Sequence, residues 1–220
     1  MALRIKICGI TKPDQASAIA NLGATALGFI CVPGTPRFVD AETISTIVSQ
    51  LSKPIDRVGV FLNAEIDQIQ NIVTIANLNA VQLHGDESPE FCDTLRSVLP
   101  TIEMIKVFRI RSVDDLKRTD QYDRVDTFLL DAYHPQQAGG TGHTIEWTSL
   151  QAFRPARSWF LAGGLKPSNI LNALSVIQPD GIDLSSGVEN APGDKNLEQV
   201  AQLFETLKLR RDSVAVDSTV

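Results

Sequence analysis

The sequence predicts a chain of the α/β class that folds as one closed barrel of parallel strands. Eight short apolar segments recur about every 25 residues, and segments with helical periodicity lie between them. The length of 220 residues suits one domain, because barrels of this kind commonly take ~200–250 residues. Together these observations indicate a single (β/α)8 TIM barrel.

The expected strands are short and mostly apolar along their whole length. Continuous apolar runs suit strands that are covered on both faces, as they are in a parallel barrel. In chain order the expected strands occupy residues 3–8, 26–31, 57–62, 80–83, 102–110, 127–131, 159–163 and 181–184. The rival, a doubly wound open sheet, would need a G-x-G-x-x-G loop after the first strand, and "KICGIT" lacks that pattern.

The segments between the strands carry helix-start signals, with Asp40 and Asn63 as the expected N-caps of two helices. The expected helical segments are 12–24, 40–51, 63–78, 86–99, 112–119, 166–177 and 194–209. No linker or low-complexity tract divides the chain, so residues 1–207 are expected to form the barrel domain. Residues 208–220 have weak periodicity and are expected to form a flexible C-terminal tail.

Composition narrows the classes of partner. The formal net charge is −6 and no extended run of Lys and Arg appears, so neither nucleic acid nor an anionic membrane is expected as a partner. No stretch reaches the ~18 apolar residues of a membrane span, and the N-terminus lacks the apolar core of a signal peptide. Cys8, Cys31 and Cys92 show no metal-binding spacing and fit a reduced, cytoplasmic protein.

Two glycine-containing loops follow the last two expected strands. In such a barrel the active site is built from the carboxyl ends of the strands, and these two loops are a frequent phosphate site. Gly163 and Gly164 follow the seventh strand, and Ser186 and Gly187 follow the eighth. Glycines let backbone N–H groups approach an anion closely, although the same glycines could simply form tight turns. The presence of both loops favours a phosphate site.

Arg37 lies in "VPGTPR", a loop that prolines stiffen after the second strand. A planar guanidinium on a rigid loop suits bidentate binding of a carboxylate, and a plain surface arginine is the alternative.

Asp131 ends the sixth strand, where partial desolvation should raise its pKa toward that of a usable general acid. A helix cap or loop anchor is the alternative role. The segment 139–142, "GGTG", could be a lid over substrate or a simple connection. His84, at the end of the fourth strand, is kept as a possible pocket residue, because no set of three histidines suggests a metal site.

Cys8 ends the first expected strand and could be either a catalytic base or a buried structural thiol. A thiol acts as a base only after ionisation, which positive neighbours or helix termini favour. From the residues alone, a buried structural thiol is the better interpretation.

The order and spacing of the motifs point to one family. In chain order they are KICGIT, GFI, TPRFV, VGVFLN, VQLHGDE, LLD, GGTGHTIEW, LAGGLKPSNI and DLSSGVENAPGDKN. Over nearly the whole chain, to about Leu207, this pattern resembles the phosphoribosylanthranilate isomerases of tryptophan biosynthesis.

The resemblance implies an eight-fold barrel that catalyses an Amadori rearrangement of N-(5-phosphoribosyl)anthranilate to the 1-deoxyribulose aminoketose. On this resemblance Cys8 is the general base that removes the C2 proton of the sugar. Asp131 is the general acid that protonates the ring oxygen, and Arg37 holds the anthranilate carboxylate.

The resemblance also implies the binding partners. Gly163, Gly164, Ser186 and Gly187 match the family's phosphate-binding loops. The substrate is then a small phosphosugar, and the reaction needs no cofactor and no metal. The sequence does not determine the oligomeric state, and a monomer or a homodimer is expected.

Three positions depart from the family's common pattern: Thr35 stands for Ser, Glu146 for Asp, and Asn196 for Asp. None is the proposed acid or base, but Thr35 could alter the hydrogen bonding of its loop and Asn196 the capping of the last helix.

Three rival functions are weaker. A metal-using phosphosugar epimerase would need several His and Asp ligands, and only His84 is placed for that role. A non-catalytic phosphate-binding barrel would not need both Cys8 and Asp131. Isomerases that also act on a histidine-pathway substrate resemble a design with aspartates in both roles, which Cys8 argues against.

Overall fold

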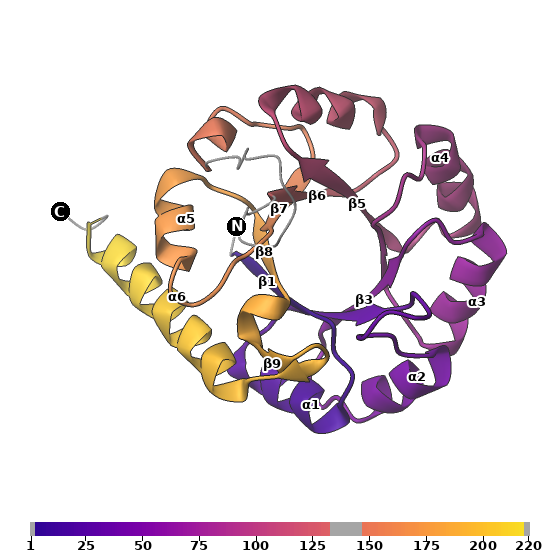
Figure 1. Cartoon of the computed structure of the whole chain (residues 1–220), viewed down its shortest axis with the longest axis horizontal. Helices are drawn as coiled ribbons and strands as arrows, with labels where there is room; N and C mark the ends of the chain where they lie inside the picture. The colour runs from indigo at the N-terminus through magenta and orange to yellow at the C-terminus, as the bar shows by residue number, and fades with distance from the viewer. Residues whose placement is uncertain (1–2, 133–146, 218–220) are drawn as a thin grey trace.

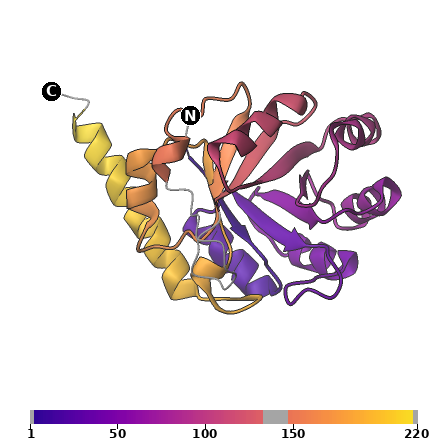
Figure 2. The same ribbon diagram turned by 45° about the horizontal axis from the view of Figure 1, so that its top comes forward.

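The computed structural model describes residues 3–132 and 147–217. Eight parallel strands close into a barrel in sequence order, and the helices form a ring outside it (Figure 1). The view in Figure 2, tilted from the first, shows the same strands surrounded by the same outer helices. The prediction of a single (β/α)8 barrel is confirmed.

Every expected strand is present, and each end agrees with the prediction to within one residue. The strands are β1 (Arg4–Cys8), β2 (Ala26–Ile30), β3 (Asp56–Phe61), β4 (Ala80–Leu83), β5 (Glu103–Ile110), β6 (Thr127–Ala132), β7 (Ser158–Ala162) and β8 (Gly181–Leu184). The barrel closes where β1 pairs with β8, with Lys6 opposite Asp183. This closure excludes the open-sheet rival.

The outer ring mixes α-helices with 3-10 helices. The α-helices are α1 (Pro13–Leu22), α2 (Ala41–Ser49), α3 (Ile66–Ile75), α4 (Pro89–Val98), α5 (Ile170–Val176) and α6 (Leu197–Asp217). The connections after β5 and β6 contain the 3-10 helices η1 (Val113–Gln121) and η2 (Trp147–Leu150). None of the helices in the described ranges is long and apolar enough to cross a membrane.

The two expected N-caps have different outcomes. The prediction for Asp40 is confirmed, because its carboxylate accepts a hydrogen bond from the Thr43 N–H at 2.7 Å. The prediction for Asn63 is wrong, because α3 begins only after Glu65. Asn63 adopts a left-handed backbone (φ 50°), and its side chain accepts from the Asp86 N–H at 2.7 Å. It therefore ties two neighbouring loops together instead of starting a helix.

A short hairpin between β8 and α6 was not predicted. It consists of β9 (Glu189–Ala191) and β10 (Asp194–Lys195), and the 3-10 turn η3 (Ser186–Val188) precedes it. Asn196 then caps α6 by accepting from the Gln199 N–H at 3.0 Å, so the departure from Asp preserves the cap. The backbone of α6 continues past Leu207 to Asp217, and the division into a domain and a flexible tail stays a prediction.

A charged network joins four strands at the amino end of the barrel, opposite the candidate site. Arg4 donates to both carboxylate oxygens of Glu103 at 2.6 and 2.7 Å and to Asp56 at 2.9 Å. Thr127 donates to the same Glu103 carboxylate at 2.7 Å. Burial alone would raise the pKa of Glu103, but Arg4 and Thr127 together hold that pKa below its ordinary value.

Arg4→Met should destabilise the barrel, because it leaves Glu103 part-buried without its cation. We expect a loss of about 2 kcal/mol of unfolding free energy near neutral pH, measured by urea denaturation. Since the pKa of Glu103 is lowered in the folded state, this contribution is complete above the ordinary carboxyl pKa. It is lost as the pH falls through the lowered value.

The matched control is Lys117→Met, which breaks the ion pair with Asp114 on an exposed surface. This variant should leave the unfolding midpoint unchanged. Equal stability of the Arg4→Met variant and the wild type would contradict the structural role given to the network.

Candidate active site

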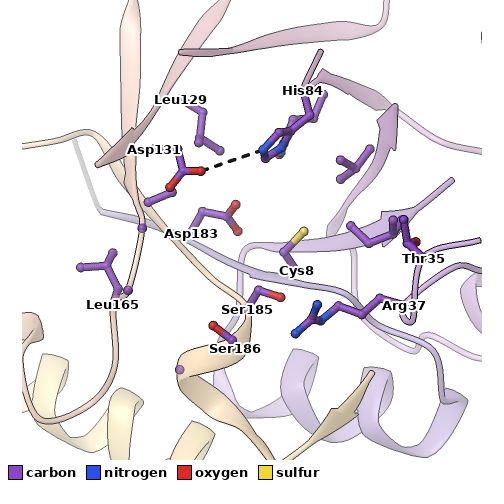
Figure 3. A pocket seen from close by; sticks show the side chains of 17 residues that line it. Cys8, Thr35, Arg37, His84, Leu129, Asp131, Leu165, Asp183, Ser185 and Ser186 are labelled. Atoms are coloured by element: carbon purple, nitrogen blue, oxygen red, sulfur yellow. Dashed lines mark hydrogen bonds and ion pairs between the residues drawn. The ribbon is translucent and has the colours of Figure 1, made fainter. Parts of the chain in front are cut away.

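A cavity of about 370 Å³ lies at the carboxyl ends of the strands. Every site residue predicted from the sequence lines it: Cys8, Arg37, His84, Asp131, Gly163, Gly164, Ser186 and Gly187 (Figure 3). The cavity is also lined by Ile30, Thr35, Val60, Gln82, Leu129, Ala162, Leu165, Asp183 and Ser185. Segments from both ends of the chain therefore converge on one space.

Cys8 faces this cavity from the end of β1, although only 5% of the residue is exposed. Burial raises the pKa of its thiol above the ordinary value, and Lys6 and Lys195 partly oppose the rise. Lys6 lies one inward-facing position below on the same strand and is fully buried. Its ammonium group donates to both oxygens of Asp183 at 3.0 Å.

Asp131 stands on the other side of the cavity, at the end of β6 (Figure 3). Burial and the negative charge of Asp183 raise the pKa of its carboxyl group, and Arg109 opposes the rise. The expectation that desolvation raises this pKa is therefore confirmed in direction. A carboxyl group that holds its proton more tightly is a better general acid near neutral pH.

His84 lies beside Asp131, with 4.0 Å between its Nε2 atom and Oδ2 of the carboxylate. Burial and the positive charges of Arg109 and Lys6 lower the pKa of His84 to about 4. The ring is therefore neutral near pH 7, and the contact with Asp131 is not an ion pair. The Gln82 amide lies 3.1 Å from Nδ1 and donates to it when the ring hydrogen is on Nε2, the nitrogen nearer Asp131.

Arg37 reaches the cavity from the loop after β2 and is paired with a carboxylate of the protein itself. Its Nε lies 3.0 and 3.1 Å from the two carboxylate oxygens of Glu189, and its Nη2 lies 2.6 Å from Oε2. Lys195 binds the same carboxylate at 2.7 Å and also donates to the Cys8 carbonyl oxygen. Arg37 is thus anchored, and the interpretation as a plain surface arginine is wrong.

The Arg37 loop has internal support as well. The Thr35 hydroxyl donates to the Val32 carbonyl at 2.8 Å, so the departure from Ser keeps a hydroxyl hydrogen bond within the loop. Within the described residues, the Nη1 group of Arg37 makes no hydrogen bond. The guanidinium therefore keeps donor capacity for a ligand in the cavity.

The two glycine loops meet in space. Gly163 and Gly164 both have positive φ (94° and 64°), which side chains rarely tolerate. A Cβ atom at Gly187 would lie 1.9 Å from the Leu165 carbonyl oxygen, so only glycine allows this approach. In the described part of the chain, the N–H groups of Gly164 and Leu165 donate to no acceptor. The site therefore offers free backbone donors where the sequence predicted phosphate.

Several residues of the site were not predicted, for identifiable reasons. Lys6 and Asp183 are charged residues inside otherwise apolar strands, and that exception to the pattern could have marked them. Glu189 and Lys195 belong to the unpredicted hairpin, so nothing in the sequence connected them to Arg37.

Other predictions lie outside the described residues: the possible lid at 139–142 and the departure at Glu146. Residues 3–132 and 147–209, whose side chains the structure describes, contain no cluster of three or more His, Cys, Asp or Glu side chains that could hold a metal ion.

Comparison with known proteins gives a consistent result. Residues 5–206 match the family described as N-(5'phosphoribosyl)anthranilate (PRA) isomerase. The N-(5'-phosphoribosyl)anthranilate isomerase of Trichormus variabilis is 57% identical over 209 residues, which cover 94% of this chain and all of the relative. That of Rippkaea orientalis is 56% identical over 207 residues, covering 94% of this chain and 96% of the relative.

Comparison with solved structures points to the same family as the sequence comparisons. Phosphoribosyl anthranilate isomerase from Thermotoga maritima is 36% identical with a TM-score of 0.84, and the match covers 94% of this chain and 99% of the other. A crystal structure of such an isomerase with reduced 1-(o-carboxyphenylamino)-1-deoxyribulose 5-phosphate is 33% identical with a TM-score of 0.82 and the same coverage. The chain therefore belongs to the N-(5'-phosphoribosyl)anthranilate isomerase family.

Proposed function

We propose that the chain isomerises N-(5-phosphoribosyl)anthranilate to 1-(2-carboxyphenylamino)-1-deoxyribulose 5-phosphate, a step of tryptophan biosynthesis, by general acid–base catalysis. Asp131 acts as the general acid and Cys8 as the general base. One observation carries the proposal: a carboxyl group with a raised pKa and a buried thiol face a single cavity from β6 and β1.

Asp131 opens the sugar ring in the first step. Its carboxyl group gives a proton to the ring oxygen, and the bond from that oxygen to C1 breaks. The lone pair of the anthranilate nitrogen forms a double bond to C1, which leaves a positively charged Schiff base. The raised pKa of Asp131 keeps the donated proton available.

Cys8 performs the second proton transfer. Its thiolate takes the proton from C2, the C–H electron pair becomes a C1–C2 double bond, and the electrons of the C1–N double bond return to nitrogen. The resulting enol becomes the ketone when its hydroxyl proton leaves and C1 gains a proton. The nearby positive charge of the Schiff base stabilises the thiolate. The proton transfer then neutralises both charges.

The two ends of the substrate would be held at separate places. The free donor capacity of Arg37 suits the anthranilate carboxylate, and the open N–H groups of Gly164 and Leu165 suit the phosphate. These anchors would hold the sugar carbons between Asp131 and Cys8.

We further propose that the chain acts in the cytoplasm as a monomer or homodimer. A related structure is described as the monomeric form of a dimeric enzyme from Thermotoga maritima.

The central test is turnover of freshly made phosphoribosylanthranilate, followed by the loss of its anthranilate fluorescence. Cys8→Ser replaces a thiol with a hydroxyl that barely ionises, and Asp131→Asn keeps the shape but has no acidic proton. Each variant should lose ~10²–10⁴-fold in kcat while remaining folded. Alkylation of Cys8 should abolish turnover, and bound product should protect the thiol.

Cys92→Ser serves as the control, because Cys92 lies buried in α4 and does not line the cavity. Its kcat should stay near the wild-type value. A folded Cys8→Ser enzyme with near-normal kcat would return Cys8 to the role of core filler.

Arg37 should affect binding more than chemistry. Arg37→Ala removes the guanidinium, and Arg37→Lys keeps the charge but loses the planar fork. We expect KM to rise at least about tenfold in the alanine variant, with a smaller fall in kcat, in steady-state kinetics. Unchanged KM in both folded variants would refute the assignment of the anthranilate carboxylate to Arg37.

The phosphate site can be seen directly. A crystal grown with sulfate should hold the anion against the N–H groups around Gly164 and Gly187. Gly187→Ala forces a Cβ atom against Leu165 and should raise both KM and the inhibition constant of inorganic phosphate. An ordered sulfate elsewhere, with these loops empty at saturating concentration, would contradict the assignment.

A further inference from the structure

A buried ion pair lies directly beneath Cys8, and the proposed reaction does not account for it. We propose that Lys6 is the positioning residue of the Cys8 base: its ammonium group, held by Asp183, stabilises the ionised sulfur beneath the substrate. The inference rests on the proposed function, because Lys6 can assist the reaction in this way only if Cys8 acts as a thiolate.

The first support is the geometry of Lys6. The side chain is completely buried, and the ammonium group binds both Asp183 oxygens at 3.0 Å. Lys6 and Asp183 are also register partners across the β1–β8 closure, so the backbone fixes their side chains on the same inner face. A lysine that is never exposed keeps its charge only beside a carboxylate, and this one is held at a defined point in the barrel.

The second support is the space around Gly28, on the neighbouring strand β2. A Cβ atom at Gly28 would lie 2.6 Å from Sγ of Cys8 and 3.0 Å from Nζ of Lys6. The sulfur atom of Cys8 and the ammonium group of Lys6 therefore both lie next to the space that the absent side chain of Gly28 leaves open. Gly28 pairs with Cys8 in the β1–β2 register, so the gap lies beside the thiol.

Besides Lys6, four titratable groups on three elements act on Cys8. Asp183 on β8 opposes ionisation of the thiol, and Lys195 on β10 favours it. Arg37 and Cys31, both in the loop after β2, interact electrostatically with Cys8 as well. Lys6 is the strongest of the charged neighbours that favour the thiolate.

The ammonium of Lys6 also holds its proton firmly. Burial lowers the pKa of Lys6, but Asp183 and Cys8 more than compensate, so that its pKa lies above the ordinary lysine value. A fixed positive charge at close range typically lowers an acid's pKa by ~1–3 units relative to its absence. Lys6 therefore limits the rise that burial imposes on the thiol.

The test reads the thiolate without any substrate. Iodoacetamide alkylation of Cys8 is followed by mass spectrometry between about pH 6 and pH 10, because the rate tracks the thiolate fraction. In Lys6→Met, the alkylation profile should move upward by at least about one pH unit. At a fixed pH below the midpoint, the rate should fall about tenfold or more.

The matched control is Lys106→Met, which removes another buried ammonium group, paired with Glu87 at 3.0 Å. It should not move the Cys8 profile, because Lys106 is not among the charges that act on Cys8. If Lys6→Met does not fold, Lys6→Met combined with Asp183→Asn leaves no unpaired carboxylate. This double variant is compared with Asp183→Asn alone, because the charge of Asp183 opposes ionisation of the Cys8 thiol and is then absent from both proteins. The double variant should have its alkylation profile at the higher pH.

An unchanged Cys8 profile in folded Lys6→Met, the same profile in the double variant as in Asp183→Asn, or an equal displacement in Lys106→Met, would overturn the proposal. The measurement separates this inference from the proposed function. Normal turnover with an unmoved profile defeats the role of Lys6 alone. A displaced profile in a chain that does not turn over phosphoribosylanthranilate defeats the isomerase assignment, but not the effect of Lys6 on the thiol.

Discussion

The hydrogen bonds between β1 and β8 close the barrel, and the candidate site depends on this closure. They bring Cys8 and Lys6, near one end of the chain, against Asp183 and the glycine loop after β8. Because all eight strands are parallel, their carboxyl ends meet at one rim, where the functional side chains converge. The closing register also places a lysine directly opposite an aspartate, so the seam of the barrel carries the charge beneath the proposed base.

Buried lysines recur in this molecule, each with a carboxylate partner that comes from another element. Lys6 binds Asp183, Lys106 binds Glu87, and Lys195 binds Glu189. Buried pairs of this kind contribute little net stability when compared with apolar replacements, but removing one partner is costly. Their positions suggest a different benefit: each pair ties a strand or loop to a defined place at the functional end of the barrel. The Arg4 network does the same at the opposite end.

The sequence predicted the scaffold better than the contacts. The strands were found because buried parallel strands are continuous apolar runs, and the site residues because the fold assigns chemistry to strand ends. Asn63 misled the prediction because asparagine serves equally well as a helix cap and as a left-handed loop residue. The ion pair between Arg37 and Glu189 could not be predicted from the sequence. The two residues are distant in the chain, and Glu189 lies in a hairpin with only two short strands.

The two aspartates of the cavity show how the same side chain takes two roles. Lys6 donates to both carboxylate oxygens of Asp183, so the charge of Asp183 is paired with a buried ammonium group. Within residues 3–132 and 147–209, no lysine or arginine pairs with Asp131 in this way. Burial and the charge of Asp183 raise the pKa of Asp131, and the charge of Arg109 only partly opposes them. One negative charge thus anchors the cation beneath Cys8 and also strengthens the hold of Asp131 on its proton. The proposed acid and the proposed base are therefore coupled through Asp183, and a change to this residue should alter the pKa values of both Asp131 and Cys8.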